Sequence, residues 1–400
     1  MGTKATKYRG LEFGEALLEE RGGKKAFKTR GDIMSTPPTP KELHRIYSSG
    51  FRGIRPESIN SKAKAKWKKF RAASPRLYDI FPWAKNLGKG KLNAPWLGAV
   101  AMIKGWGGLY AQVQGDCTVH GTEHASEIDY CMDCLYGETK FMGPLAFENI
   151  YRSRGFNGDG WSCEAPCMYV GPQGSGGFLH RIKYVSPDGK ETVDLTDYNS
   201  SWQSKGGSGV PKWLEEISRL NKAKYIIPIE NREEYRDAHA LGFGINFCSG
   251  QAWRSSTDEF GVAGASGSWS HALCHPGNND TEWAYLKYKM MLGMIQNSWG
   301  NWNTINGKPP GHPDMSTGSW YSLESAIMRL MDGDQFAVCG VWGWDRTSWE
   351  GFDISDLVKH MRNSTQQDYY KVRSEKLVRL TEKAYDIGVE KLTREEAMAV

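Results

Sequence analysis

A segment of helical length begins directly after Cys117, and it limits more than any other feature how this chain can fold. Residues 118–136, TVHGTEHASEIDYCMDCLY, contain few helix breakers, and the tight Gly-Asp turn of QVQGDC brings the chain to their start. Backbone N–H groups at a helix N-terminus lack partners within the helix, so they stabilise a thiolate placed there. Cys117 is therefore a candidate nucleophile, and the competing interpretation is a small buried apolar side chain.

Two later segments supply the groups that a nucleophilic thiol needs. His271 lies in GSWSHALC, where small and apolar neighbours indicate a strand that enters a cleft. Asn297 lies in MIQNSWGNW, where an apolar strand ends and Trp299 can cover the Asn side chain. An imidazole can act as the base of a thiol, and a third polar group can orient the imidazole. These segments favour a catalytic Cys117.

The chain order of these three residues resembles that of the papain family of cysteine peptidases. His271 follows Cys117 by 154 residues, and Asn297 follows His271 by 26 residues. NSWG is that family's asparagine motif, SHAL is similar to its histidine motif, and GDCT stands where the family has Gly-Ser-Cys-Trp. The resemblance spans about residues 93–348 and extends to papain-like proteins of tailed bacteriophages, which share QxxGDC, WSHAL, NSWG and segments similar to ENIYRSRGFNGDGW and GDQFAVCGVWGW.

The resemblance implies a role for each residue of the motifs. The Cys117 thiolate attacks a carbonyl carbon, His271 holds the ion pair and protonates the leaving amine, and Asn297 orients the imidazole. Gln112 and the Cys117 backbone N–H form the oxyanion hole. The residues expected at the substrate are Gly158, Gly160, Trp269 and Trp299. The two glycines also fit a plain turn.

Two features of the resemblance leave an alternative: which glutamine belongs to the oxyanion hole, and how QVQGDC aligns with the papain motif. Papain has its glutamine six residues before the nucleophile, whereas Gln112 stands five residues before Cys117 and Gln114 stands three before it. If QVQGDC is instead aligned with Gln-Asn-Gln-Gly-Ser-Cys, Cys117 matches a disulfide cysteine and His120 occupies the catalytic position. That register predicts an inactive protein. We prefer the first register, because it places GDC directly before the helix and keeps all four catalytic residue types.

The predicted fold is α+β, with two lobes and a cleft between them. The resemblance implies a helical lobe that begins with the Cys117 helix and a β-rich lobe that holds the other two catalytic residues. We divide the chain into a basic N-terminal arm at 1–92, a papain-like domain at 93–348 and a helical C-terminal appendage at 349–400. In the appendage, SEKLVRLTEKAYDIGVEKL has helical periodicity, and TREE indicates a capping box at Thr393.

The N-terminal part of the chain is strongly basic. Residues 1–95 carry 22 Lys and Arg against 8 Asp and Glu. Their densest run, SKAKAKWKKFR, sets one Trp among cations, a pattern that suits stacking on a base together with phosphate contacts. A solvated helix face or contact with an acidic protein surface explains the run equally well. The residues expected to contact nucleic acid or a partner are Lys62, Lys64, Lys66, Lys68, Lys69 and Arg71.

Composition and motifs also narrow the class of protein. No apolar run approaches the roughly 20 residues that span a bilayer, so we expect no membrane contact. The N-terminus has no apolar segment typical of a secretory signal, which predicts synthesis in a cytoplasm. Eight cysteines are too sparse for a disulfide scaffold, so reduced thiols are expected. CMDC and CEAPC leave a structural zinc as the alternative, whereas we expect no metal and no cofactor.

Two function classes follow, and both can hold together. The first is a thiol hydrolase that cleaves peptide or isopeptide bonds in a peptide or protein substrate. The second is a virion structural protein that keeps the papain-like body as a scaffold, while its arm and tail contact other virion subunits. The resemblance to phage proteins implies synthesis in the host cytoplasm and residence in the virion.

The charge of the arm generates the first prediction. Residues 1–95 should bind an acidic surface, and if that surface is nucleic acid, the affinity should fall steeply with added salt, because phosphate contacts release counterions. The measurement is binding to labelled DNA at several salt concentrations, with and without residues 1–90. Binding that is unchanged by the deletion would contradict the prediction that this arm binds nucleic acid.

Overall fold

The computed structural model of this protein describes most of the chain from residue 68 onward. The described ranges are 68–108, 110–136, 139–162, 164–299, 307–315, 318–332, 338–344 and 365–400. Within them, the side chains of residues 249, 268–270, 332, 338–344 and 365–367 are not described. Helices and strands both occur throughout these ranges, so the predicted α+β class is confirmed.

A mainly antiparallel sheet forms the larger lobe. Its strand order is β6-β12-β7-β9-β10-β11-β8, and β1 pairs with the end of β9 on the edge opposite β10. The strands are β1 (Leu92–Asn93), β6 (Ala223–Pro228), β7 (Ile245–Trp253), β8 (Val262–Ala263), β9 (Ala265–Asn279), β10 (Leu292–Gln296), β11 (Ser319–Leu323) and β12 (Val338–Trp344). Strand β9 is the longest of these, with 15 residues, and pairs with β7, β10 and β1. It therefore links both halves of the sheet.

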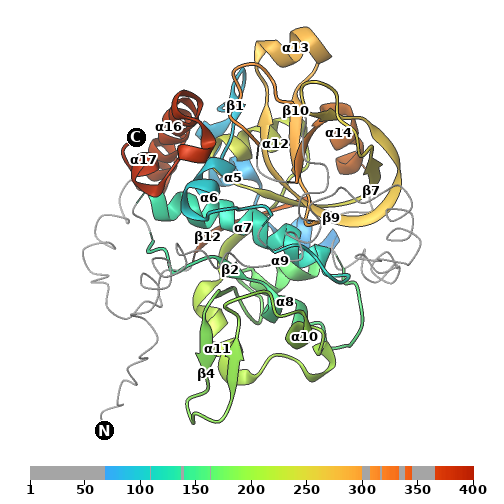
Figure 1. The fold of residues 1–400 in the computed structure, drawn as a ribbon, viewed down its shortest axis with the longest axis vertical. Coiled ribbons are helices and arrows are strands. Elements are labelled where there is room, and N and C mark those ends of the chain that lie inside the picture. Colours follow the sequence, from blue (N-terminus) through green and yellow to red (C-terminus); the bar gives the residue numbers. More distant parts are fainter. Residues whose placement is uncertain are drawn as a thin grey trace.

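Helix α7 (Cys117–Leu135) crosses the middle of the molecule between the sheet and a smaller lobe (Figure 1). All 19 of its residues are buried. It packs against β9, β12 and β7 on one side and against α6 (Trp96–Met102) on another. The sequence predicts a helix at 118–136 that begins directly after Cys117, and the observed helix begins at that cysteine.

The smaller lobe lies below α7 in the view of Figure 1. Its helices are α8 (Glu148–Arg152), α9 (Glu164–Val170), α10 (Ser200–Gln203) and α11 (Lys212–Ser218). Two strand pairs complete it, β2 (Leu145–Ala146) with β3 (Leu179–His180) and β4 (Lys183–Val185) with β5 (Thr192–Asp194). Short helices α12 (Arg232–Ala240), α13 (Glu282–Tyr288) and α14 (Glu324–Asp332) belong to the sheet lobe.

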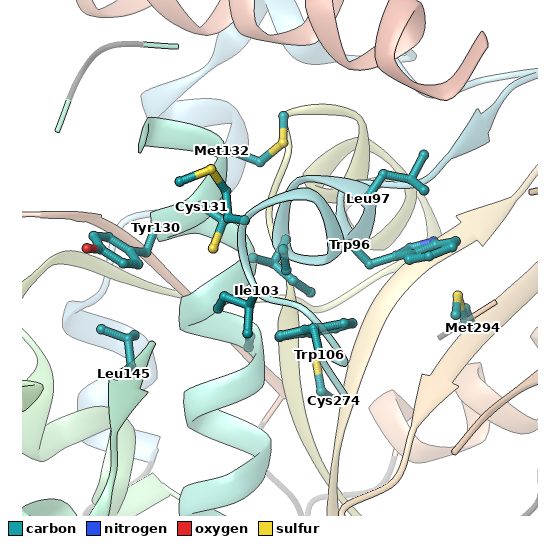
Figure 2. Packing of buried hydrophobic residues seen from close by; sticks show 14 of the residues in the cluster. Trp96, Leu97, Ile103, Trp106, Tyr130, Cys131, Met132, Leu145, Cys274 and Met294 are labelled. Carbon is teal, nitrogen blue, oxygen red and sulfur yellow. The ribbon is translucent and has the colours of Figure 1, made fainter. Parts of the chain in front are cut away.

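The packing between α6 and α7 joins the helices to the sheet. Figure 2 shows Ile103 near Cys131 of α7, whereas Trp96 points away from α7 toward the strand that carries Met294. Gly98 permits the close approach of the two helices, because a Cβ there would lie 2.6 Å from the Met132 sulfur. Trp96 is fully buried, and burying a large apolar side chain contributes roughly 2 to 3 kcal/mol to folding.

The described part of the predicted arm packs on the body. Leu77 in α5 (Leu77–Ile80) and Phe81 are buried, and Phe81 contacts the ring of Tyr370 edge-on. Leu77 and Phe81 therefore belong to the core, and a deletion that tests the arm should leave residues 77–84 in place.

The C-terminal helices α16 (Thr365–Ile387) and α17 (Arg394–Met398) also pack on the body, against α6 and α7. Thr393 caps α17, where its hydroxyl accepts a hydrogen bond from the Glu396 N–H at 3.2 Å. This is the cap expected from TREE. No helix within the described ranges has the length and apolar character required to cross a membrane.

Buried ion pairs fasten α16 to α7. The Arg373 guanidinium is fully buried and donates to Asp129 at 2.6 Å and to Asp133 at 2.7 Å. It also donates to the Gly242 carbonyl oxygen, and Tyr369 donates to Asp133. Because one cation offsets two buried carboxylates, these contacts depend on Arg373.

Removing Arg373 should therefore destabilise the protein strongly. Arg373→Met leaves Asp129 and Asp133 buried without their cation, so the free energy of unfolding should fall by about 3 to 5 kcal/mol. Lys371→Met is the matched control, since Lys371 stands on the same helix in an exposed pair with Asp368, and should cost below about 1 kcal/mol. Denaturant unfolding measures both, and equal losses would contradict the prediction.

Candidate active site

Cys117 lies at the first position of α7, as predicted, and its thiol is a free one. Its sulfur accepts a hydrogen bond from the backbone N–H of Ala272 at 3.4 Å, and the backbone N–H groups of Thr118 and Cys117 also face it. Ala272 directly follows His271 on β9, so the helix start and the histidine strand meet at the thiol.

Two glycines permit the close packing of segments around Cys117. A Cβ on Gly121 would lie 2.9 Å from the Leu273 carbonyl oxygen, so only glycine allows α7 to approach β9 this closely. A Cβ on Gly115 would lie 2.7 Å from the Cβ of Asp159. Glycines on either side of Cys117 therefore allow neighbouring segments to pack closely against the start of α7.

His271 and Asn297 form the predicted pair. The His271 Nε2 and the Asn297 Oδ1 are 2.8 Å apart, and both residues are buried. Asn297 directly follows β10, and its Oδ1 also accepts from the Ser298 N–H at 2.8 Å. Trp299 stacks on the imidazole with ring centroids 4.4 Å apart and an interplanar angle of 22°. The indole covers one imidazole face, while Asn297 occupies one imidazole nitrogen.

The Gln112 side chain is hydrogen-bonded to two residues of the NSWG motif. Its Oε1 accepts from the Ser298 hydroxyl at 2.7 Å and from the Trp299 Nε1 at 3.1 Å. The Gln114 side chain turns elsewhere and donates to the Ser200 carbonyl oxygen at 3.4 Å. The geometry therefore favours Gln112 as the site glutamine. Its own Nε2 donates to the Gln114 carbonyl oxygen at 2.6 Å, so an oxyanion would have to compete for that donor.

Burial governs the charge of the thiol and of the imidazole. Burial raises the pKa of Cys117 to about 12, although the Ala272 N–H and the N–H groups of the helix start act in the opposite direction. Burial lowers the pKa of His271 to about 4, although the hydrogen bond to Asn297 raises it. These pKa values favour the neutral form of both groups at pH 7.

The glycines of NGDGW lie beside the nucleophile turn. Gly158 and Gly160 have φ angles of 99° and 82°, which favour glycine. The Gly160 N–H donates to the Gly115 carbonyl oxygen at 2.9 Å and to the Tyr151 hydroxyl at 3.1 Å. The loop has the tight turn that the sequence allows, and it is next to the site.

The register that makes Cys117 a disulfide cysteine does not match this geometry, since Cys117 is free and begins the helix. His120 lies one turn further along α7, fully buried, with its ring 4.2 Å from that of Phe147. Cys248 is disulfide-bonded, so the expectation of reduced thiols throughout is wrong there. Among the residues that the structure describes, no three His, Cys, Asp or Glu side chains cluster to hold a metal ion.

Other predicted residues fall outside this constellation. The Trp269 side chain and the residues Lys62, Lys64 and Lys66 lie outside the described residues. Lys68 and Lys69 are exposed. Arg71 forms an ion pair with Glu230 at 2.6 Å, so this cation already contacts an acidic group of its own chain.

Sequence reasoning missed the surroundings of Asp116. This residue stands inside the GDC motif, yet its sequence environment gives no sign that its carboxylate is buried. The structure shows that carboxylate accepting hydrogen bonds from Tyr198 and Gln203, more than 80 residues away along the chain.

The chain is similar to several solved cysteine proteases. The proform of Amb a 11, a ragweed pollen cysteine protease, is 14% identical with a TM-score of 0.42, covering 86% of this chain and 99% of that one. Procathepsin L2 from the Tenebrio molitor larval midgut is 13% identical with a TM-score of 0.39, covering 82% and 88%. Xylellain from Xylella fastidiosa is 12% identical with a TM-score of 0.38, covering 58% and 82%. No family model and no curated protein matches the chain.

The neutral His271 can be tested directly. In NMR titrations of the imidazole resonances, His271 should stay neutral down to about pH 4, and Asn297→Ala should lower its pKa further, because the Asn297 Oδ1 favours the protonated ring. A depressed pKa adds stability that is present above pH 6.5 and is lost as the pH falls through 4. A midpoint near 6.5 would contradict the burial, and one above 7 would show a preformed ion pair.

Proposed function

We propose that this chain is a papain-like thiol hydrolase that cleaves peptide or isopeptide bonds and is associated with a bacteriophage virion. One observation carries the proposal. The free Cys117 thiol at a helix start lies against the backbone beside His271, whose Nε2 is bound by Asn297 under the Trp299 ring. These residue types in this arrangement are those of a thiol nucleophile with an oriented base.

The first half of the reaction forms an acyl-enzyme. Since the His271 Nε2 is committed to Asn297, Nδ1 is the nitrogen that takes the Cys117 proton. The thiolate sulfur bonds to the substrate carbonyl carbon, and the electron pair of the C=O π bond moves to oxygen. When the C–N bond breaks, the imidazolium gives its proton to the leaving amine. The thiol must first be uncovered, because substrate cannot reach a fully buried sulfur.

One backbone donor and one side-chain donor stabilise the developing oxyanion. The helix start supplies the Cys117 N–H, and the Gln112 carboxamide adds a second donor once it leaves the Gln114 carbonyl oxygen. A donor of this kind contributes roughly 3 to 4 kcal/mol to the transition state in a well-studied hydrolase.

The second half of the reaction releases the acid product. Water attacks the thioester carbonyl carbon, and His271 accepts a proton from that water. The C–S bond then breaks, the sulfur takes back a proton from the imidazolium, and the carboxylic acid leaves. The neutral thiol and imidazole are restored.

The virion association rests on the sequence segments shared with phage papain-like proteins. It predicts synthesis in the host cytoplasm, peptide or protein substrates and other virion subunits as partners, with the basic arm available to nucleic acid. The disulfide at Cys248 fits residence outside a reducing cytoplasm, where such bonds persist.

A second candidate is a non-catalytic virion scaffold that keeps the papain-like body for its shape. The observation that favours it is the burial of Cys117, which raises the pKa of the thiol to about 12. A thiol that stays buried and protonated is a poor nucleophile.

Substitutions separate the two candidates, because groups used in chemistry differ from groups used in packing. Cys117→Ser should abolish labelling by a thiol-reactive epoxide at this position while changing the free energy of unfolding by less than about 1 kcal/mol. His271→Ala should slow the labelling by about 10²- to 10⁴-fold, since it removes the base. Asn297→Ala should slow it less, because only the orientation of the ring is lost.

The internal reference for the labelling is Cys274, a buried free cysteine of β9. Peptide mapping gives the rate at both positions in one sample. If Cys117 reacts no faster than Cys274, the hydrolase proposal is wrong and the scaffold stands.

A further inference from the structure

Asp116 carries a buried carboxylate at the residue before the nucleophile. It is the N-cap of α7 and is fully buried. Its Oδ2 accepts hydrogen bonds from the Tyr198 hydroxyl and from the Gln203 Nε2, both at 2.5 Å. Gln203 also donates to the Tyr198 oxygen at 2.9 Å. The three side chains form a closed triangle that ties the nucleophile turn to residues 198–203 of the smaller lobe.

Several ionisable groups surround this carboxylate, and some of them can change charge as the pH changes. They are His120 of α7, Tyr151 and Glu148 of α8, Tyr198, His271 of β9, Cys117 and the exposed Asp159. Burial, with the Asp116 carboxylate adding to it, raises the pKa of Tyr198 and of Tyr151 well above the ordinary value, so both hydroxyls stay neutral in any ordinary titration. Glu148 is paired with Arg181. His120, whose Nε2 is 3.6 Å from the Asp116 Oδ2, needs its own control.

We propose that Asp116 is a positioning residue of the thiol site, which holds the nucleophile turn against the smaller lobe and sets the pH range in which Cys117 reacts. The inference rests on the proposed function. The geometry behind it is a carboxylate adjacent in sequence to the nucleophile, excluded from water and bound by two neutral donors. A charge in such a place acts on its neighbours through a medium of low dielectric, where electrostatic effects are large.

The sign of the effect follows from proton counting. The thiol and imidazole together lose two protons as the pH rises. Each loss lowers the net charge of the pair near the carboxylate by one unit. Burial is the larger influence on both groups, and the Asp116 carboxylate shifts the pKa of His271 and of Cys117 upward. Without the carboxylate, both steps should occur at lower pH, whichever group loses its proton first.

Asp116→Asn tests this with little change of shape. The rate of epoxide labelling at Cys117, followed by peptide mapping across the pH range, should keep its form while both inflections move to lower pH by about one unit. Asp116→Ser provides a second uncharged N-cap residue if the amide variant does not fold. NMR titration of His271 should show the same downward displacement.

Matched variants separate charge from packing. Tyr198→Phe removes one donor but keeps the carboxylate, so it should lower the labelling rate without moving both inflections downward. Asp188→Asn removes an equal charge from the exposed hairpin between β4 and β5 and should change neither. In a His120→Gln background, the displacement by Asp116→Asn should persist.

The outcomes are distinct. Unmoved inflections in Asp116→Asn, at any labelling rate, or a displacement lost with His120→Gln, would overturn the role of Asp116 in setting the pH range while leaving the hydrolase intact. A wild-type Cys117 that reacts no faster than Cys274 would overturn the proposed function, and this inference with it.

Discussion

The complete burial of α7 is the constraint on which the rest of the structure depends. A helix buried on every side cannot leave its ionisable side chains to water, and an unpaired buried charge costs several kcal/mol. Several of these groups have a partner from a distant segment. Glu127 accepts from the Leu145 N–H and the Trp106 indole, Asp129 and Asp133 receive Arg373, and Asp116 at the cap receives Tyr198 and Gln203. One helix thus organises both lobes and the C-terminal helices.

The same burial places opposite demands on the site. It excludes water, which strengthens the electrostatic contacts at the site, and it also disfavours the charged forms of Cys117 and His271. The N–H groups around the Cys117 sulfur and the Asn297 oxygen at His271 offset part of this cost. Burial therefore favours the neutral thiol and the neutral imidazole in this structure.

The residues with distinctive side chains were those that the sequence could predict. Cys117 at a helix start and the pairing of His271 with Asn297 follow from short motifs, because each motif determines its own local backbone. Other features depend on segments that meet only in three dimensions. The burial of Asp116 needs Tyr198, and the close packing of α7 on β9 needs Gly121 opposite Leu273. From the sequence alone, a glycine within a predicted helix only lowers the expected stability of that helix. The structure shows that Gly121 is needed for the close packing of β9 on α7.

The ion pairs of Arg373 have a consequence for the order in which the molecule is made. Ribosomes deliver a chain from its N-terminus, so α7 emerges more than 200 residues before its cation. Until Arg373 has been synthesised, Asp129 and Asp133 lack the cation that offsets their charge in the folded protein. The contact between α16 and α7 can therefore form only after most of the chain has been synthesised.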